Sequence, residues 1–409
     1  MACLIHRLYN ERAFRRERVI RDRSNPLDIY NDEELIERFR FGRRDLFELI
    51  EELPPDLRFV SGRNAALPPA LQLLIALRFY GNGAFQNTVG DMISVHKSTA
   101  CRAIRRVSLA LSRRLELHVH LPTEAEAVGM KQRFRQASGI PGIVGCIDGT
   151  HVKIQAPSQH EYLFVNRKGY HSINVQIACD ASYKIFNLVA RWPGSTHDAR
   201  ILRESALYRD FEAGRVNGLL LGDSGYPLKR WLMTPIIAPR TDQERRYNTI
   251  HSATRSVVER CIGVLKRRFH CLHGELRMRP ERVCTVIAAC TVPHNICVTK
   301  RIPLPRQDHQ PVQEEDGLHQ SMSDPSAARQ HCTSERSGPW TPLPPPLPPH
   351  PPPHSPLSLA QPSSSLTHVA AEHCETPTPP PLTQPPPPLP ATVSAILRSL
   401  TGFTPLSSH

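Results

Sequence analysis

The chain has 409 residues, enough for two or three domains of ordinary size, and a formal net charge of +13 that favours a polyanionic partner. The same charge also suits a soluble basic protein without such a partner. No secretory signal is apparent, and the longest apolar run, residues 70–79, is too short to span a bilayer. We therefore expect an intracellular protein with free thiols and no membrane contact.

The first part of the chain is basic and then helical. Residues 1–30 form an arginine-rich lead-in, whose interleaved acids argue against a transit peptide. Residues 31–128 carry apolar side chains at three- and four-residue intervals, which predicts an all-α N-terminal domain. Two short helices in it, at 84–94 and 98–115, are joined by only three residues, a spacing typical of a helix-turn-helix.

In a helix-turn-helix, the second helix presents basic side chains to DNA phosphates. The candidates here are Lys97, Arg102, Arg105 and Arg106. A plain helical hairpin with a solvated basic face would contain the same residues, and the sequence leaves both interpretations open.

Between residues 140 and 300 the pattern changes to mixed α/β. The predicted elements are, in chain order, strands at 142–154, 172–181 and 184–193, a helix at 197–211, strands at 218–223 and 235–239, and a helix from about His251 to His270. The short turn between the second and third strands predicts an antiparallel hairpin. This order predicts an α/β fold with a ribonuclease H-like mixed sheet flanked by helices.

Three acids stand at unusual places in these elements. Asp148 interrupts the first strand, Asp223 follows directly on the fourth, and Glu259 lies at the border of the apolar stripe of the last helix. An ionised carboxylate withdrawn from water is costly unless a positive group meets it. Bound Mg²⁺ or Mn²⁺ explains all three, and such ions catalyse phosphodiester cleavage by a two-metal mechanism. We therefore expect Asp148, Asp223 and Glu259 to be catalytic metal ligands.

Other readings of the same residues stay open. Glu259 could be a surface acid paired with Arg255, and Asp198 could be either a ligand or a helix N-terminal acid. His151 and His197 suit water or ligand positioning as well as a structural role. Lys266, on the same helix face as Glu259, is a candidate phosphate contact.

Five motifs in the same order resemble the PIF/Harbinger transposases and the Harbinger transposase-derived nucleases. They are CIDGTHVKI, GYHSINVQIACD, NLVARWPGSTHDARIL, LLLGDSGYPL and RSVVERCIGVLKRRF, and the likeness extends over roughly Asp32 to Lys300. The resemblance implies a DDE nuclease domain at 140–300 that depends on a divalent cation. It identifies Asp148, Asp223 and Glu259 as the acidic triad and adds Asp198 as a further candidate metal ligand.

The resemblance also implies DNA as the substrate, cleaved by hydrolysis or by strand transfer. It implies a nuclear protein, with the cytoplasm as a second location, and a separate Myb/SANT-like DNA-binding partner. The alternative function is a retained DNA-binding protein that is catalytically silent.

Two features depart from the family. Pro293 lies within the last predicted helix, where a proline costs about 3 kcal/mol, so we expect a kink or a break there. Residues 301–409 contain about two-thirds of the 40 prolines and are expected to form a disordered tail. Such a tail suits contacts with SH3 or WW domains, or a scaffold role.

Overall fold

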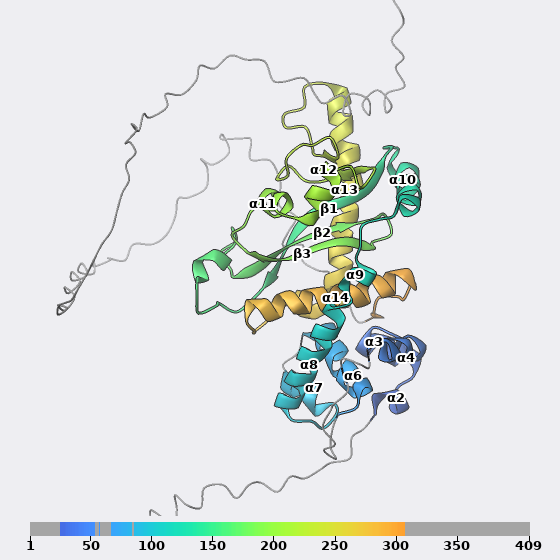
Figure 1. The fold of residues 1–409 in the computed structure, drawn as a ribbon, viewed down its shortest axis with the longest axis vertical. Coiled ribbons are helices and arrows are strands. Elements are labelled where there is room, and N and C mark those ends of the chain that lie inside the picture. Colours follow the sequence, from blue (N-terminus) through green and yellow to red (C-terminus); the bar gives the residue numbers. More distant parts are fainter. Residues whose placement is uncertain (1–24, 54–56, 58–66, 84–85, 307–409) are drawn as a thin grey trace, which may run out of the picture. The chain divides into compact units, whose positions relative to one another are not determined.

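The structure is a computed structural model that describes residues 25–53, 57, 67–83 and 86–306 (Figure 1). Its helices are α2 (Pro26–Ile29), α3 (Asp32–Phe39), α4 (Arg43–Glu52), α6 (Pro69–Asn82), α7 (Gln86–Asp91), α8 (Lys97–Ser112), α9 (Leu115–His118), α10 (Glu124–Ser138), α11 (Asp198–Arg203), α12 (Ala206–Glu212), α13 (Asp242–Arg268) and α14 (Pro280–Thr299). Its strands are β1 (Ile143–Lys153), β2 (Ser172–Cys179), β3 (Ile185–Pro193), β4 (Leu219–Leu221) and β5 (Leu232–Met233). Most of the predicted lead-in and the predicted disordered tail beyond residue 306 lie outside the described residues.

The strands form one mixed sheet in the order β3-β2-β1-β4-β5. β1 pairs with β2, and β2 with β3, in antiparallel fashion, whereas β4 pairs parallel with β1 and β5 parallel with β4. The turn between β2 and β3 is closed by the Asp180 carboxylate, which accepts from the amides of Ser182 and Lys184 at 2.8 and 2.9 Å. The predicted mixed α/β class and the predicted hairpin are therefore confirmed.

Helices cover both faces of the sheet. Alternate residues of a strand point to opposite faces, and β1 accordingly contributes to two apolar clusters. Val144 and Ile147 join the cluster built with α10, α11 and α12. Cys146 and Val152 join the cluster built with α13, α14 and the N-terminal helices. The sheet is thus a central layer, and side chains of β1 reach the helices on both of its faces.

The N-terminal helices share the second of these clusters with the sheet. Arg40 ends α3 in a left-handed conformation (φ 74°), and its buried guanidinium donates to the carbonyls of Gly81 and Arg268, each at 2.6 Å. It thereby links α3, the end of α6 and the end of α13. The expected domain division at 31–128 and 140–300 stays a prediction.

Three sequence expectations need correction. The fifth strand is Leu232–Met233 rather than 235–239. The long helix begins at Asp242 rather than near His251, because Thr241 and Glu244 form a capping box there. The expected break at Pro293 is wrong, since α14 is unbroken from Pro280 to Thr299 and Pro293 itself is buried, whereas the expected kink stays a prediction.

Residues 70–79 are the longest apolar run read from the sequence, but α14 is a longer apolar helix. Among the described residues, α14 is long and apolar enough to cross a bilayer by length and composition. Its apolar window is 61% buried inside the protein, which is the pattern of a core helix.

Candidate active site

The sheet register brings Asp148 and Asp223 together. β4 runs parallel to β1, with Leu221 beside Cys146. Asp148 comes two residues after Cys146, and Asp223 two residues after Leu221. The two acids therefore lie at the same level, just beyond the end of β4. Asp148 lies on the central strand opposite Ile177 of β2, and its side chain is only 17% exposed. The predicted pairing of these two acids across neighbouring strands therefore has a structural basis.

Asp198 reaches the same site from the first turn of α11. An amide hydrogen of Asn174 on β2 is donated to its Oδ1 at 2.8 Å, and a second to the carbonyl of Thr196 at 2.8 Å. Gly149 makes room for it, since a Cβ at that position would lie 2.6 Å from Asp198 Oδ1. A residue with a side chain at 149 would displace the carboxylate. Asp198 is thus held by Asn174 of β2 and occupies the space that Gly149 of β1 leaves open.

The three aspartates influence one another electrostatically. Burial raises the pKa of Asp148 to about 7, Arg255 opposes this rise, and the negative charges of Asp223 and Asp198 add to it. Burial also raises the pKa of Asp198; its hydrogen bond from Asn174 opposes that rise, and Asp223 adds to it. Crowded carboxylates with raised pKa values are typical of sites that bind a cation or transfer protons.

Glu259 is connected to this group through an arginine. Arg255, one turn earlier on α13, donates from Nη1 to Asp148 Oδ2 at 2.8 Å and from Nη2 to the Glu259 carboxylate. The Glu259 side chain is 51% exposed, whereas that of Arg255 is only 19% exposed. The ion pair with Arg255, left open as an alternative reading of Glu259, is therefore present, and the same guanidinium also reaches Asp148.

The carboxylates do not form a ready metal cage. Within the described part of the chain, no three His, Cys, Asp or Glu side chains are grouped in a way that could hold a metal ion. The hard oxygen donors are of the type that Mg²⁺ and Mn²⁺ prefer. The assignment of Asp148, Asp198, Asp223 and Glu259 as ligands stays a prediction.

Two further side chains border the acids and were missed from the sequence. Tyr226, in the segment after Asp223, is 4% exposed, and its hydroxyl has no hydrogen-bond partner among the described residues. Burial raises the pKa of Tyr226, and the negative charges of Asp198, Asp148 and Asp223 raise it further. Burial lowers the pKa of His251 to about 4, so this α13 side chain is neutral near pH 7. The motif that follows Asp223 contains Tyr226 but does not reveal its burial.

The candidate DNA-binding residues fall into two groups. Lys97, Arg102 and Arg105 are exposed on α8, and Arg106 is half-buried there. The α7–α8 turn needs a glycine, because a Cβ at Gly90 would lie 2.6 Å from the carbonyl oxygen of Val95. Lys266 lies on α13, and its Nζ donates to the carbonyl of His151 at 3.1 Å. Contact of these groups with DNA stays a prediction.

The two candidate histidines are placed at the ends of elements near the acids. His151 lies on β1, and its Nδ1 is 3.0 Å from the hydroxyl of Ser172. His197 is the N-cap residue of α11, directly before Asp198, and its positive form lowers the pKa of that carboxyl. His151 therefore supports the local structure, the side chain of His197 makes no capping hydrogen bond to α11, and a role of either toward a ligand stays a prediction.

Comparison with known proteins places these residues in a family. A family model described as a DDE superfamily endonuclease matches residues 147–295. The chain is 40% identical over 275 residues to "Putative nuclease HARBI1" of Bos taurus, covering 66% of this chain and 79% of that protein. It is 38% identical to the Homo sapiens protein of the same name, covering 71% and 86%, and 26% identical to "Protein ALP1-like" of Arabidopsis thaliana, covering 56% and 60%. No solved structure matches. The chain belongs to the Harbinger-derived family of DDE superfamily nucleases.

Proposed function

We propose that this protein is a metal-dependent DNA nuclease whose site is formed by Asp148, Asp198, Asp223 and Glu259. The observation that carries the proposal is the mutual electrostatic influence of three aspartates, from β1, the end of β4 and the start of α11, with the pKa of Asp148 raised to about 7. Such crowding of carboxylates destabilises the fold unless positive charge compensates it. A structural role alone does not explain why three aspartates stand together here. The strand order supports a ribonuclease H-like fold for this domain.

The residues present fit a divalent cation by their donor chemistry. Asp148 and Asp223 would hold it from rigid positions, Asp198 would complete the set on the α11 side, and half-exposed Glu259 would do so on the α13 side. A bound Mg²⁺ or Mn²⁺ would activate water and stabilise charge on the phosphate. Arg255 stabilises the ionised form of Asp148, and Asn174 orients Asp198.

DNA binding is proposed to involve both parts of the chain. Lys266 on α13 lies on the same helix as Glu259, and its ammonium would contact a phosphate beside the site. The exposed basic side chains of α8 would hold the flanking duplex. The family also leads us to propose a nuclear location and a Myb/SANT-like DNA-binding partner protein.

One observation favours the alternative of a catalytically silent DNA-binding protein. The Arg255 guanidinium already compensates Asp148 and Glu259 together, as a metal ion would. In such a protein the arginine takes the place of the cation, and the acids carry out no chemistry.

A nicking assay on supercoiled plasmid DNA with Mg²⁺ or Mn²⁺ distinguishes the two. We expect nicking by the wild type and a loss of at least 100-fold in Asp223→Asn and in Glu259→Gln. Glu275→Gln is the matched control, because Glu275 is 48% exposed and also pairs with one arginine, Arg277. Equal nicking by Glu259→Gln and Glu275→Gln would remove Glu259 from the mechanism.

Calorimetric titration with Mn²⁺ gives a readout that does not depend on activity. The nuclease proposal expects binding that Asp148→Asn and Asp223→Asn abolish. Absence of binding at millimolar Mn²⁺, together with absence of nicking, would establish the silent alternative.

A further inference from the structure

β3 is an outer strand of the sheet, and one stretch of its free edge is regular. Its ladder with β2 shifts register at both ends, between Asn174 and Val175 and again between Ala178 and Cys179. Between these irregularities, residues 187–190 pair without interruption. Across the described residues, no hydrogen bond from outside the β2–β3 ladder reaches the backbone of these four residues. Bulges, charges and covering segments normally protect such an edge.

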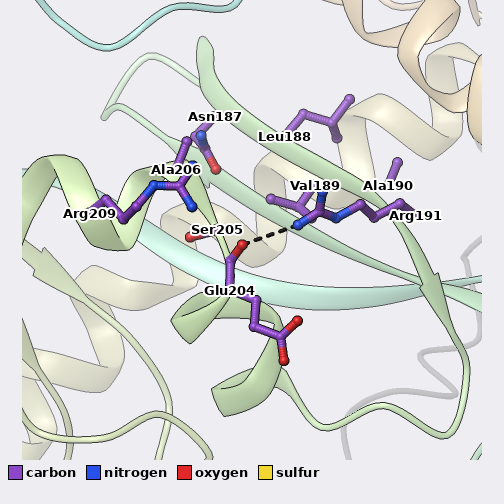
Figure 2. A pocket seen from close by; sticks show the side chains of 9 residues that line it. All are labelled: Asn187, Leu188, Val189, Ala190, Arg191, Glu204, Ser205, Ala206 and Arg209. Carbon is purple, nitrogen blue, oxygen red and sulfur yellow. Dashed lines mark hydrogen bonds between the residues drawn. The ribbon is translucent and has the colours of Figure 1, made fainter.

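A groove of about 320 Å³ runs along this stretch (Figure 2). One wall is made by residues 187–191 and the other by Glu204, Ser205, Ala206 and Arg209, from the end of α11 and the start of α12. Five consecutive residues of one strand line the groove, although successive side chains point to opposite faces. The groove therefore follows the edge of the strand rather than one face of the sheet.

The same edge already binds a peptide-like group one step earlier. The side-chain amide of Asn295 on α14 accepts from the amide of Ile185 at 2.9 Å and donates to its carbonyl at 2.6 Å. A carboxamide has the donor and acceptor geometry of a backbone peptide. Asn187 lies on the other side of the register shift from Ile185. It lines the groove, and its side-chain oxygen has no hydrogen-bond partner among the described residues.

The charge of the groove selects the sign of its occupant. Arg191 and Arg209 extend from opposite walls of the groove, and Arg191 reaches the carbonyl of Glu204 (Figure 2). The Arg191 guanidinium donates to the neutral carbonyl of Glu204 at 3.1 Å. The Glu204 carboxylate is itself compensated by Arg200 at 3.0 Å. In the described structure neither groove arginine has a carboxylate partner, so the groove is positive.

We propose that this groove, defined by residues 187–191, 204–206 and 209, binds an extended acidic segment of a partner protein as an added strand on β3. Main-chain hydrogen bonds to the regular stretch provide the affinity, and Arg191 and Arg209 select acidic side chains at alternate positions. The proposal does not depend on the nuclease activity.

The test uses the full chain and an eight-residue peptide of alternating valine and glutamate, labelled for fluorescence anisotropy. We expect saturable binding that the double variant Arg191→Glu, Arg209→Glu weakens at least tenfold. The matched control is Arg203→Glu, an exposed arginine of α11 that does not line the groove. The double variant should instead bind a valine–lysine peptide more tightly than the wild type does.

Amide hydrogen exchange locates the peptide. The peptide should slow exchange in residues 187–191, and a peptide of equal charge with proline at alternate positions should not. Equal binding of the proline peptide, or unchanged exchange at millimolar valine–glutamate peptide, would overturn strand addition.

Two other occupants give distinct results. Self-association in sedimentation that the double variant abolishes would assign the groove to a second copy of the chain. Amide exchange in residues 187–191 could instead be slow without added peptide and become fast when the residues after Arg306 are deleted. That result would assign the groove to the chain's own tail. Either result would overturn the proposal of an acidic partner.

Discussion

The charged side chains of α8 and those of the acidic site differ in their exposure to solvent. Lys97, Arg102 and Arg105 lie in water on α8, whereas Asp148 and Asp198 are largely withdrawn from it. A solvated charge contributes little to stability, so its role must be sought in a partner. A withdrawn charge destabilises the fold and must be compensated from within. The comparison predicts large stability changes at the acids and almost none on α8.

The two buried acids are themselves compensated differently. Asp148 is met by a full positive charge from Arg255, and Asp198 by the neutral amide of Asn174. Removing the compensating group should therefore cost more at Asp148 than at Asp198.

Arg255→Ala should have the largest effect. It leaves Asp148 without its cation, and we expect a loss of about 3 kcal/mol in the free energy of unfolding at pH 8. The loss should shrink below pH 6, where Asp148 takes up a proton. Urea denaturation at both pH values measures it. Arg44→Ala, which removes an arginine from an exposed pair with Glu48, is the control. A loss no greater than that of the control would contradict the inference that Arg255 compensates Asp148.

Asp148→Asn should stabilise the protein in chelator-containing buffer. The carboxyl has a pKa of about 7 in the fold and an ordinary value when unfolded, so the folded state holds a proton that the unfolded state loses. Stability therefore decreases as the pH rises from about 4 to about 7, and the asparagine variant escapes this decrease. We expect a gain of about 2 kcal/mol at pH 8, because part of the benefit is offset by the lost Arg255 pair. Thermal denaturation as a function of pH measures this gain in stability. An equal gain at pH 4 and pH 8 would contradict the inference that the ionised Asp148 carboxylate destabilises the fold.

The local part of this architecture was predictable from the sequence. The first three strands and the short α7–α8 turn follow from apolar periodicity. Asp148 and Asp223 stood out because each interrupts or ends a run of apolar residues. Local patterns of this kind survive folding because the same residues form both the pattern and the element.

What the sequence did not reveal depends on register and packing between distant segments. Gly149 and Asn174 look unremarkable in their strands, and their contact with Asp198 appears only when β1, β2 and α11 are placed together. The fifth strand was misplaced, since two residues carry too little pattern to be recognised. Pro293 was judged by helix propensity alone, which the burial of α14 outweighs.

Asn174→Ala tests how Asp198 is compensated on the α11 side. It removes two hydrogen bonds of 2.8 Å, to Asp198 and to the Thr196 carbonyl, so we expect a loss of about 1–2 kcal/mol in stability. Loss of orientation at Asp198 should reduce nicking by about tenfold. Asn174→Asp should reduce it further, because a second carboxylate would repel Asp198. Plasmid nicking and urea denaturation measure both variants. If both variants nicked DNA as fast as the wild type, the orientation of Asp198 by Asn174 would have no role in cleavage.

The double variant Arg102→Ala, Arg105→Ala should leave stability unchanged within about 0.5 kcal/mol, since both side chains are exposed. Its effect should appear only with DNA. If each arginine neutralises one phosphate, the slope of log K against log salt for duplex DNA should fall by about 0.9 per residue. The control combines Arg44→Ala with Arg203→Ala, exposed arginines of α4 and α11, and should keep the wild-type slope. An equal change in both double variants would mean that α8 is an ordinary solvated face, and the charge left in water there would then have no assigned partner.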